Sequence, residues 1–241
     1  MTMALIALIA LCGSYIQSVT GFGFGIFVMM FFPALLRYTE ANALSTLLGI
    51  FTSLAVAVQM RRAIHWKNIV FPLLGCLMAT YGAVSFVKRQ ESQVLMMLLG
   101  AVLLVLSLYF LFFAGKLRFR PTWYAGLAAG LLSGVMSGMF SMGGPPVVIY
   151  YLQSEEDTDH YLATISGYFV CSNVVSIVTK AMAGFLTSSV WSAFTIGAIG
   201  MALGALIGKK TREQVPPQMV RKLVYGFMAL SGAVYMIGVL V

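Results

Sequence analysis

Two glycine-rich stretches interrupt long apolar runs, one at residues 20–25 and the other at residues 141–146. The first reads Thr-Gly-Phe-Gly-Phe-Gly and the second reads Ser-Met-Gly-Gly-Pro-Pro. A helix broken inside a lipid bilayer exposes backbone N–H and C=O groups, which are tolerated only where protein buries them or where they line a polar cavity. Paired breaks in corresponding parts of two halves are typical of secondary transporters with a site near the bilayer midplane. The sequence therefore favours a transport protein over a structural membrane subunit.

The composition excludes an ordinary soluble domain. Hydrophobic residues make up 60% of the chain and charged residues 9%, against roughly 25% charged residues in soluble domains. The ten-residue alternation of an outer-membrane barrel is missing from the sequence. We therefore expect an all-α, multi-pass protein in the lipid bilayer of the cell inner membrane. The net charge of +8 comes from Lys and Arg clusters between apolar runs, where they set orientation, so no nucleic-acid partner is expected.

Eight apolar segments are bounded by charged residues. They cover residues 3–36, 41–60, 68–87, 93–115, 122–153, 161–186, 188–208 and 219–241. Six of them have the length of one membrane crossing at about 1.5 Å per residue. The first and fifth are too long for one crossing and too short for two, and these two contain the glycine breaks. We expect both to be broken or re-entrant.

The two halves of the chain repeat. Five residues of one half match five of the other at a single offset: Gly75, Gly82, Ala83, Lys88 and Glu91 with Gly197, Gly204, Ala205, Lys210 and Glu213. Near the breaks, Ser18 and Gly25 match Ser137 and Gly144 at a slightly smaller offset. The pattern predicts two four-segment repeats, residues 1–115 and 116–241, within one membrane domain.

The positive charges distinguish two topologies. If all eight segments cross the membrane, 7 Lys and Arg residues lie inside and 8 outside, which shows no bias. If segments 1 and 5 are hairpins and the N-terminus is outside, the count becomes 11 inside and 4 outside. Positively charged residues favour the inner side. We therefore expect hairpins, three full crossings in each half, and an inverted repeat.

The breaks supply the candidate substrate-binding site. Pro145 or Pro146 suits the first turn of a new helix, and the N–H groups and dipole at such a helix start favour an anion. Glycines let the backbone approach a ligand closely, although glycines such as Gly21 and Gly25 also have the spacing of a helix-packing motif. Hydroxyls and amides before each break add hydrogen-bond donors, with Gln17 and Ser141 favoured. The candidate binding residues are Gln17, Ser18, Thr20, Gly21, Gly23, Gly25, Ser137, Ser141, Gly143, Gly144, Pro145 and Asn173.

Polar stripes on the second and sixth segments either line a pathway or hold helices together. Asn42 and Ser45 are the pathway candidates in the second segment, and Asn173 is the strongest polar candidate outside the breaks because an unpaired amide in mid-membrane is costly. Arg37 and Lys180 lie toward segment ends, where they can reach the interface and attract an anion. By contrast, two series of glycines at four-residue steps, beginning at Gly130 and Gly200, predict helix-packing faces.

The apolar runs contain no catalytic dyad, no paired carboxylates and no metal-ligand cluster, so neither an enzyme nor a metal or cofactor site is expected. His65 and His160 fall in loops and are expected to be solvated. A channel-like anion permease with selectivity from backbone dipoles stays open as the alternative to a transporter. Proton coupling is compatible with a weak-acid substrate that carries the proton itself, and a homo-oligomer is compatible with the sequence.

The chain resembles the TauE/SafE sulfite exporter family over essentially its whole length. The resemblance rests on the Gly-Gly-Pro-Pro at residues 143–146, the glycines from Gly21 to Gly25 followed by Phe32-Pro33, and the internal duplication. It implies a membrane permease that exports sulfite, sulfoacetate or a related sulfur-containing anion.

Overall fold

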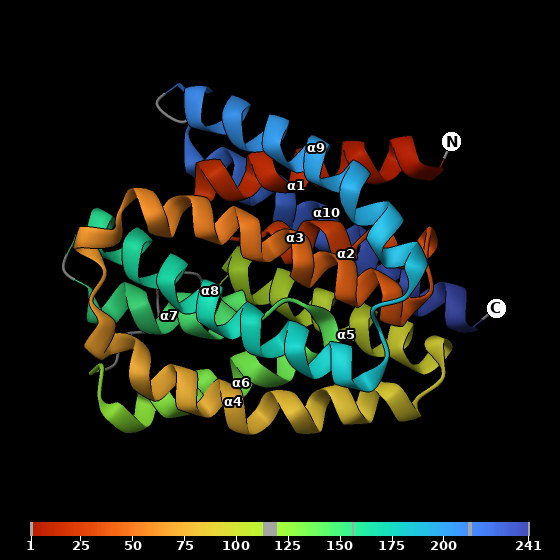
Figure 1. The fold of residues 1–241 in the computed structure, drawn as a ribbon, viewed down its shortest axis with the longest axis horizontal. Helices are drawn as coiled ribbons and strands as arrows, with labels where there is room; N and C mark the ends of the chain where they lie inside the picture. Colours follow the sequence, from red (N-terminus) through yellow and green to blue (C-terminus); the bar gives the residue numbers. More distant parts are fainter. Residues whose placement is uncertain (1, 113–119, 156, 212–213, 241) are drawn as a thin grey trace.

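The computed structural model describes residues 2–112, 120–155, 157–211 and 214–240, whose regular elements are all helices (Figure 1). The helices are α1 (Thr2–Thr20), α2 (Phe24–Met29), η1 (Phe32–Ala34), α3 (Tyr38–Gln59), η2 (Arg61–Ala63), α4 (Trp66–Arg89), α5 (Ser92–Phe112), α6 (Trp123–Phe140), α7 (Gly144–Ser154), α8 (Thr158–Ala183), α9 (Ser188–Thr211) and α10 (Pro217–Leu240). The predicted boundary at 115/116 and the residues Lys116, Arg118, Glu156, Arg212 and Glu213 lie outside the described residues.

The fold is that of a multi-pass membrane protein, as the sequence predicts. Seven helices within the described ranges (α1, α3, α4, α5, α6, α8 and α9) are long and apolar enough to cross a bilayer. The eighth long helix, α10, has a shorter apolar stretch over Lys222–Gly238. Both glycine-rich stretches interrupt the helices as expected, between α1 and α2 and between α6 and α7.

Each broken segment folds back on itself. A β-carbon added to Gly13 of α1 would lie 3.0 Å from Val28 of α2, although fifteen residues separate these positions in the sequence. In the same way, a β-carbon on Gly126 of α6 would lie 3.0 Å from the Tyr150 hydroxyl of α7. A merely kinked helix would place each pair about 1.5 Å per residue apart along its axis. Both broken segments therefore fold as helical hairpins, as predicted, while their entry and return on one side of the membrane stays a prediction.

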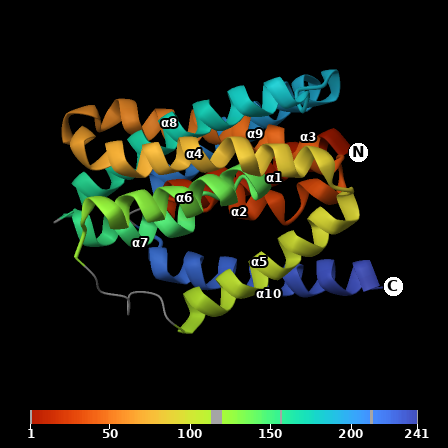
Figure 2. The same cartoon turned by 90° about the horizontal axis from the view of Figure 1, so that it is seen from below.

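The two chain ends lie at the same end of the helix bundle in both views (Figures 1 and 2). The corner between α3 and α4 and the first turn of α10 lie at the opposite end. Two hairpins and six long helices give this arrangement. Which end faces the cytoplasm stays a prediction from the positive charges.

The helices of the two halves pair reciprocally. The first helix of each half packs on the third long helix of the other half, α1 on α9 and α6 on α4. Helix α3 packs on α8, and α5 packs on α10. Two equivalent four-segment halves would produce this pairing. It supports the division into residues 1–115 and 116–241, which stays a prediction.

Glycines allow the closest of these contacts. In α6, a β-carbon on Gly130 would overlap the Pro72 carbonyl of α4, and one on Gly134 would lie 2.6 Å from the Cys76 carbonyl. In α9, a β-carbon on Gly200 would overlap the Ala7 carbonyl of α1. Backbones that approach this closely gain dispersion contacts that larger residues prevent. The two predicted helix-packing faces are confirmed.

Candidate functional site

The two breaks meet inside the bundle. Gly21 and Gly23 have φ angles of 84° and 106°, which glycine adopts without strain. Ser141, at the other break, has a φ of 55° and is the one non-glycine residue with positive φ in the described part of the chain. A β-carbon on Gly25 would overlap the Ser141 carbonyl, so the backbones of the two breaks are in direct contact. A serine held in this conformation marks a constrained point of the fold.

A small cavity lies where the breaks meet, and we call it the central cavity. Its volume is about 40 Å³, above the roughly 10–15 Å³ that a cavity needs to hold a water molecule. The central cavity is lined by Gln17, Gly23, Phe24, Gly25, Ile26, Ser45, Gly49, Ser53, Ser137, Ser141, Met142, Gly143, Gly144, Phe169, Ser172 and Asn173. The first two segments of each half therefore build it together.

Eight of the twelve predicted binding residues line the central cavity: Gln17, Gly23, Gly25, Ser137, Ser141, Gly143, Gly144 and Asn173. The other four, Ser18, Thr20, Gly21 and Pro145, do not. Ser18 instead packs against Gly208 of α9. The Thr20 hydroxyl donates to the Ile16 carbonyl of its own helix at 2.9 Å. Helix α7 begins at Gly144, one residue earlier than Pro145, and places both prolines in its first turn.

Four apolar lining residues, Phe24, Ile26, Met142 and Phe169, were not predicted. An aromatic or aliphatic residue inside an apolar run carries no signal that separates a cavity wall from the helix core. Gly49, Ser53 and Ser172 belong to the polar stripes, or lie beside them, and the structure places them at the cavity.

Polar groups with unused hydrogen-bonding capacity face the central cavity. Ser45 is buried, lines the cavity, and its hydroxyl has no hydrogen-bond partner within the described structure. The Asn173 side chain likewise has no protein partner among the described residues, and its amide nitrogen lies beside Gly49. Gln17 is partly engaged, since its amide nitrogen donates to the Thr52 hydroxyl at 3.0 Å. Buried polar groups normally find partners, so a polar ligand or water fits here.

Asn42 holds the second break in place and does not line the cavity. Its side-chain nitrogen donates to the carbonyls of Gly138 and Met139, the latter at 2.5 Å. Its backbone carbonyl accepts a hydrogen bond from the Ser141 hydroxyl at 2.7 Å. The last carbonyls of a helix that ends inside the protein need such donors. Asn42 therefore caps α6, and of the two pathway candidates in this segment only Ser45 reaches the cavity.

The expected position of Lys180 is wrong. This side chain is fully buried and does not reach the membrane interface. Its amino group donates to the Ser141 hydroxyl at 2.9 Å and to the Ser137 carbonyl at 3.1 Å, and it also donates to the Thr46 hydroxyl. Helix α6 ends at Phe140, inside the bundle, and this leaves the space that the lysine fills. Arg37, in contrast, is exposed before the start of α3, as expected.

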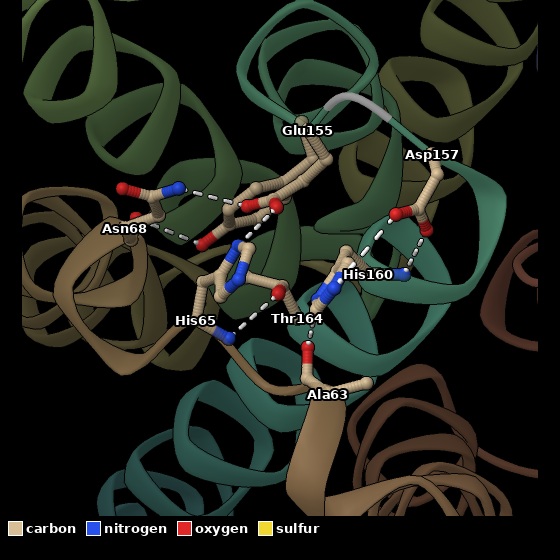
Figure 3. Close-up of polar contacts among 8 residues, drawn as sticks. Ala63, His65, Asn68, Glu155, Asp157, His160 and Thr164 are labelled. Atoms are coloured by element: carbon tan, nitrogen blue, oxygen red, sulfur yellow. Dashed lines mark hydrogen bonds and ion pairs between the residues drawn. The ribbon is translucent and has the colours of Figure 1, made fainter.

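The two histidines form a cluster at the end of the bundle opposite the chain termini, where His65 is exposed and His160 partly exposed, in keeping with their predicted solvation (Figure 3). The imidazole rings of His65 and His160 stack with centroids 4.1 Å apart. The His65 ring bonds the Glu155 carboxylate at 2.7 Å, and the amide of Asn68 donates to the same carboxylate at 2.9 Å. The cluster joins the α3–α4 corner to the α7–α8 corner, so it ties the second hairpin to the first half.

Asp157 caps α8 at the edge of this cluster, and its removal gives a first test. The His160 N–H donates to the Asp157 carboxylate at 2.8 Å, and this bond holds the pKa of Asp157 below its usual range. A carboxyl whose pKa is lower in the folded state stabilises the fold at neutral pH and loses that contribution as the pH falls. We expect Asp157→Ala to lower the midpoint of thermal unfolding at pH 7. The difference from the wild type should shrink as the pH falls below about 3.9.

The matched control for the cap is Asp159→Ala, because Asp159 is exposed in the first turn of α8 but does not occupy the cap position. A pH-independent loss in Asp157→Ala, or an equal loss in both variants, would rule out a charged cap.

Comparisons with known proteins agree with this architecture. The family model described as "Sulfite exporter TauE/SafE" matches residues 5–235. A protein of Cupriavidus necator described as "Probable sulfite/organosulfonate exporter TauE" is 26% identical over 231 residues, which cover 93% of this chain and 90% of the relative. No solved structure gives a significant match.

Proposed function

Since the chain belongs to the TauE/SafE sulfite exporter family, we propose that it is a secondary transporter that carries a small sulfur-containing anion through the central cavity. Sulfite or an organosulfonate is the proposed substrate, as in the printed name of the Cupriavidus necator relative. The cell inner membrane is the proposed location.

One observation carries this proposal: the two helix breaks enclose the central cavity between them. An oxyanion accepts hydrogen bonds and cannot donate them, so it needs N–H and O–H groups. The buried Ser45 hydroxyl at the cavity has this capacity unused, and the Asn173 amide lines the same cavity. Helix α7 begins with Gly144 at the cavity wall, so the positive end of its dipole lies there.

The size of the central cavity also suits a small substrate. A volume of about 40 Å³ is far below the roughly 300–1,000 Å³ of pockets that take drug-sized ligands. Passage of the substrate from one side of the membrane to the other then requires movement of the hairpins, which is how alternating access proceeds in transporters with inverted repeats. Proton coupling and the oligomeric state are separate questions for the purified protein.

Flux into liposomes tests the proposal, with Gly144→Leu as the blocking variant. A β-carbon on Gly144 has ordinary room, 3.5 Å from the Phe169 ring, but a longer side chain would enter the cavity. We expect the wild type to show saturable sulfite flux that responds to a pH gradient, and we expect Gly144→Leu to fall to the level of protein-free liposomes. Thiosulfate, sulfoacetate and chloride complete the panel.

Gly82→Leu is the matched control, because Gly82 is exposed and nothing lies within 4 Å of an added β-carbon. Uncoupled flux that includes chloride would favour a channel-like permease. The absence of sulfur-anion flux in the wild type would refute the proposed substrate class.

A further inference from the structure

Lys180 places an amino group directly behind the wall of the central cavity. Two of the residues to which it donates, Ser137 and Ser141, line the cavity, while Thr46 and Lys180 itself do not. An ammonium group has three N–H donors. The protein supplies three acceptors with Ser137, Ser141 and Thr46. A bound anion would therefore not touch the lysine but would lie beyond the serines that the lysine holds.

The amino group lacks an opposite charge. The ion pairs found in the described ranges join His65 to Glu155 and His160 to Asp157, and neither includes Lys180. The carboxylate of Glu40, on the neighbouring helix α3, accepts a hydrogen bond from Thr187 instead. Burial of an ammonium group without a counter-ion is costly, and a paired one is much less so. The surroundings of Lys180 thus favour an anion nearby.

The negative end of the α6 helix dipole compensates part of the positive charge of a Lys180 ammonium group, but not all of it. Lys180 bonds the Ser137 carbonyl in the last turn of α6, where the helix dipole is equivalent to about half a negative charge. Its remaining acceptors are neutral hydroxyls. An anion in the central cavity would balance the rest of the charge of a protonated Lys180 across the wall formed by Ser137 and Ser141.

We infer that Lys180 is a positioning residue that supplies the positive charge which retains the anion in the central cavity and admits anions in preference to neutral solutes. This inference rests on the proposed function of the same cavity. The lysine acts through the field of its ammonium group, without direct contact with the anion.

The test uses purified full-length protein and three substitutions at this position. Lys180→Met removes the charge and the donors, Lys180→Gln removes the charge but keeps donors, and Lys180→Arg keeps the charge. Lys88→Met is the matched control, because it removes one positive charge from an exposed position at the end of α4. Each protein is checked for a single peak in size-exclusion chromatography. If Lys180→Met does not fold, Lys180→Gln alone tests the loss of the charge.

Sulfite is the first probe, read out as the shift in thermal unfolding midpoint and as KM and Vmax of liposome flux. We expect Met and Gln to raise KM by at least about tenfold, as loss of a nearby charge in a low-dielectric site predicts. Vmax should change less, and the sulfite-induced thermal shift should disappear. Lys180→Arg should retain part of the thermal shift, and Lys88→Met should behave as the wild type.

A purely structural cap would give a different result. Met and Gln variants that lose stability but keep the wild-type KM and thermal shift would overturn the inference. If sulfite gives the wild type neither a thermal shift nor flux, the proposed substrate is wrong. The same comparison is then made with thiosulfate and chloride. An anion that stabilises the wild type and not Lys180→Gln would then still support the role of Lys180, and no response of the wild type to any of the three would overturn it.

Discussion

Replacement of Gly25 by alanine is expected to abolish transport while leaving the protein inserted in the membrane. The added β-carbon would overlap the carbonyl of Ser141 on the opposite break. The carbonyl is backbone and the position of a β-carbon is fixed by its own backbone, so no side-chain rotation relieves the overlap and the two breaks must separate. Overpacking of this kind costs typically about 1–3 kcal/mol of stability, and it displaces the wall of the central cavity. Sulfite flux in liposomes, together with the unfolding midpoint, measures both effects.

The control for Gly25→Ala is Gly49→Ala, which adds the same atom elsewhere on the wall of the central cavity. The new β-carbon there would lie 3.4 Å from the Asn173 side chain, an ordinary contact with an adjustable group. We expect Gly49→Ala to keep most of the flux. Wild-type flux in Gly25→Ala would show that contact between the two breaks is not needed for transport.

Alanine at the glycine contacts between helices is expected to destabilise the whole fold. In Gly130→Ala the new β-carbon would overlap the Pro72 carbonyl of α4, and in Gly200→Ala it would overlap the Ala7 carbonyl of α1. Each helix pair would have to move apart and lose dispersion contacts along its length, at a cost of about 1–3 kcal/mol or more. Thermal unfolding in detergent measures the loss. The two sites lie on different helix pairs, so the losses should add in the double variant.

Gly226→Ala is the control for the helix contacts. Gly226 is exposed on α10, and nothing lies within 4 Å of an added β-carbon. Because alanine favours helix by up to about 1 kcal/mol over glycine, this variant should match or exceed the stability of the wild type. Equal destabilisation in all three variants would contradict the packing role of Gly130 and Gly200.

The general architecture could be predicted because its determinants are local in the sequence. Apolar length predicts a crossing helix, and glycines at four-residue steps predict a close helix contact. A segment of 34 or 32 residues with a central break predicts a hairpin, since one crossing needs about 20 residues. These features do not depend on the rotation of a helix about its axis. For the same reason the meeting of two breaks could be anticipated from their equivalent positions.

The details of the site depend on helix rotation and on where neighbouring helices end. Gln17 faces the central cavity while Ser18, the next residue, packs against α9, and the apolar run that contains both does not distinguish them. The position of Lys180 near the end of its segment predicts an interfacial side chain. The Lys180 side chain is buried because α6 ends beside it, at the start of the second break. No pattern within α8 shows where another helix stops.

The crossed pairing of the helices determines the order in which this protein can be assembled during synthesis. Helix α1 is synthesised before α2 to α8, yet its main partner is α9, which emerges from the ribosome only after all of them. Until then the glycine face of α9 is absent, and the backbone carbonyls of Ala7 and Leu11 have no close neighbour there. Contacts between residues so distant in sequence form late. Nascent chains that stop before α9 should therefore remain substrates for membrane chaperones and quality-control proteases, however well their individual helices insert.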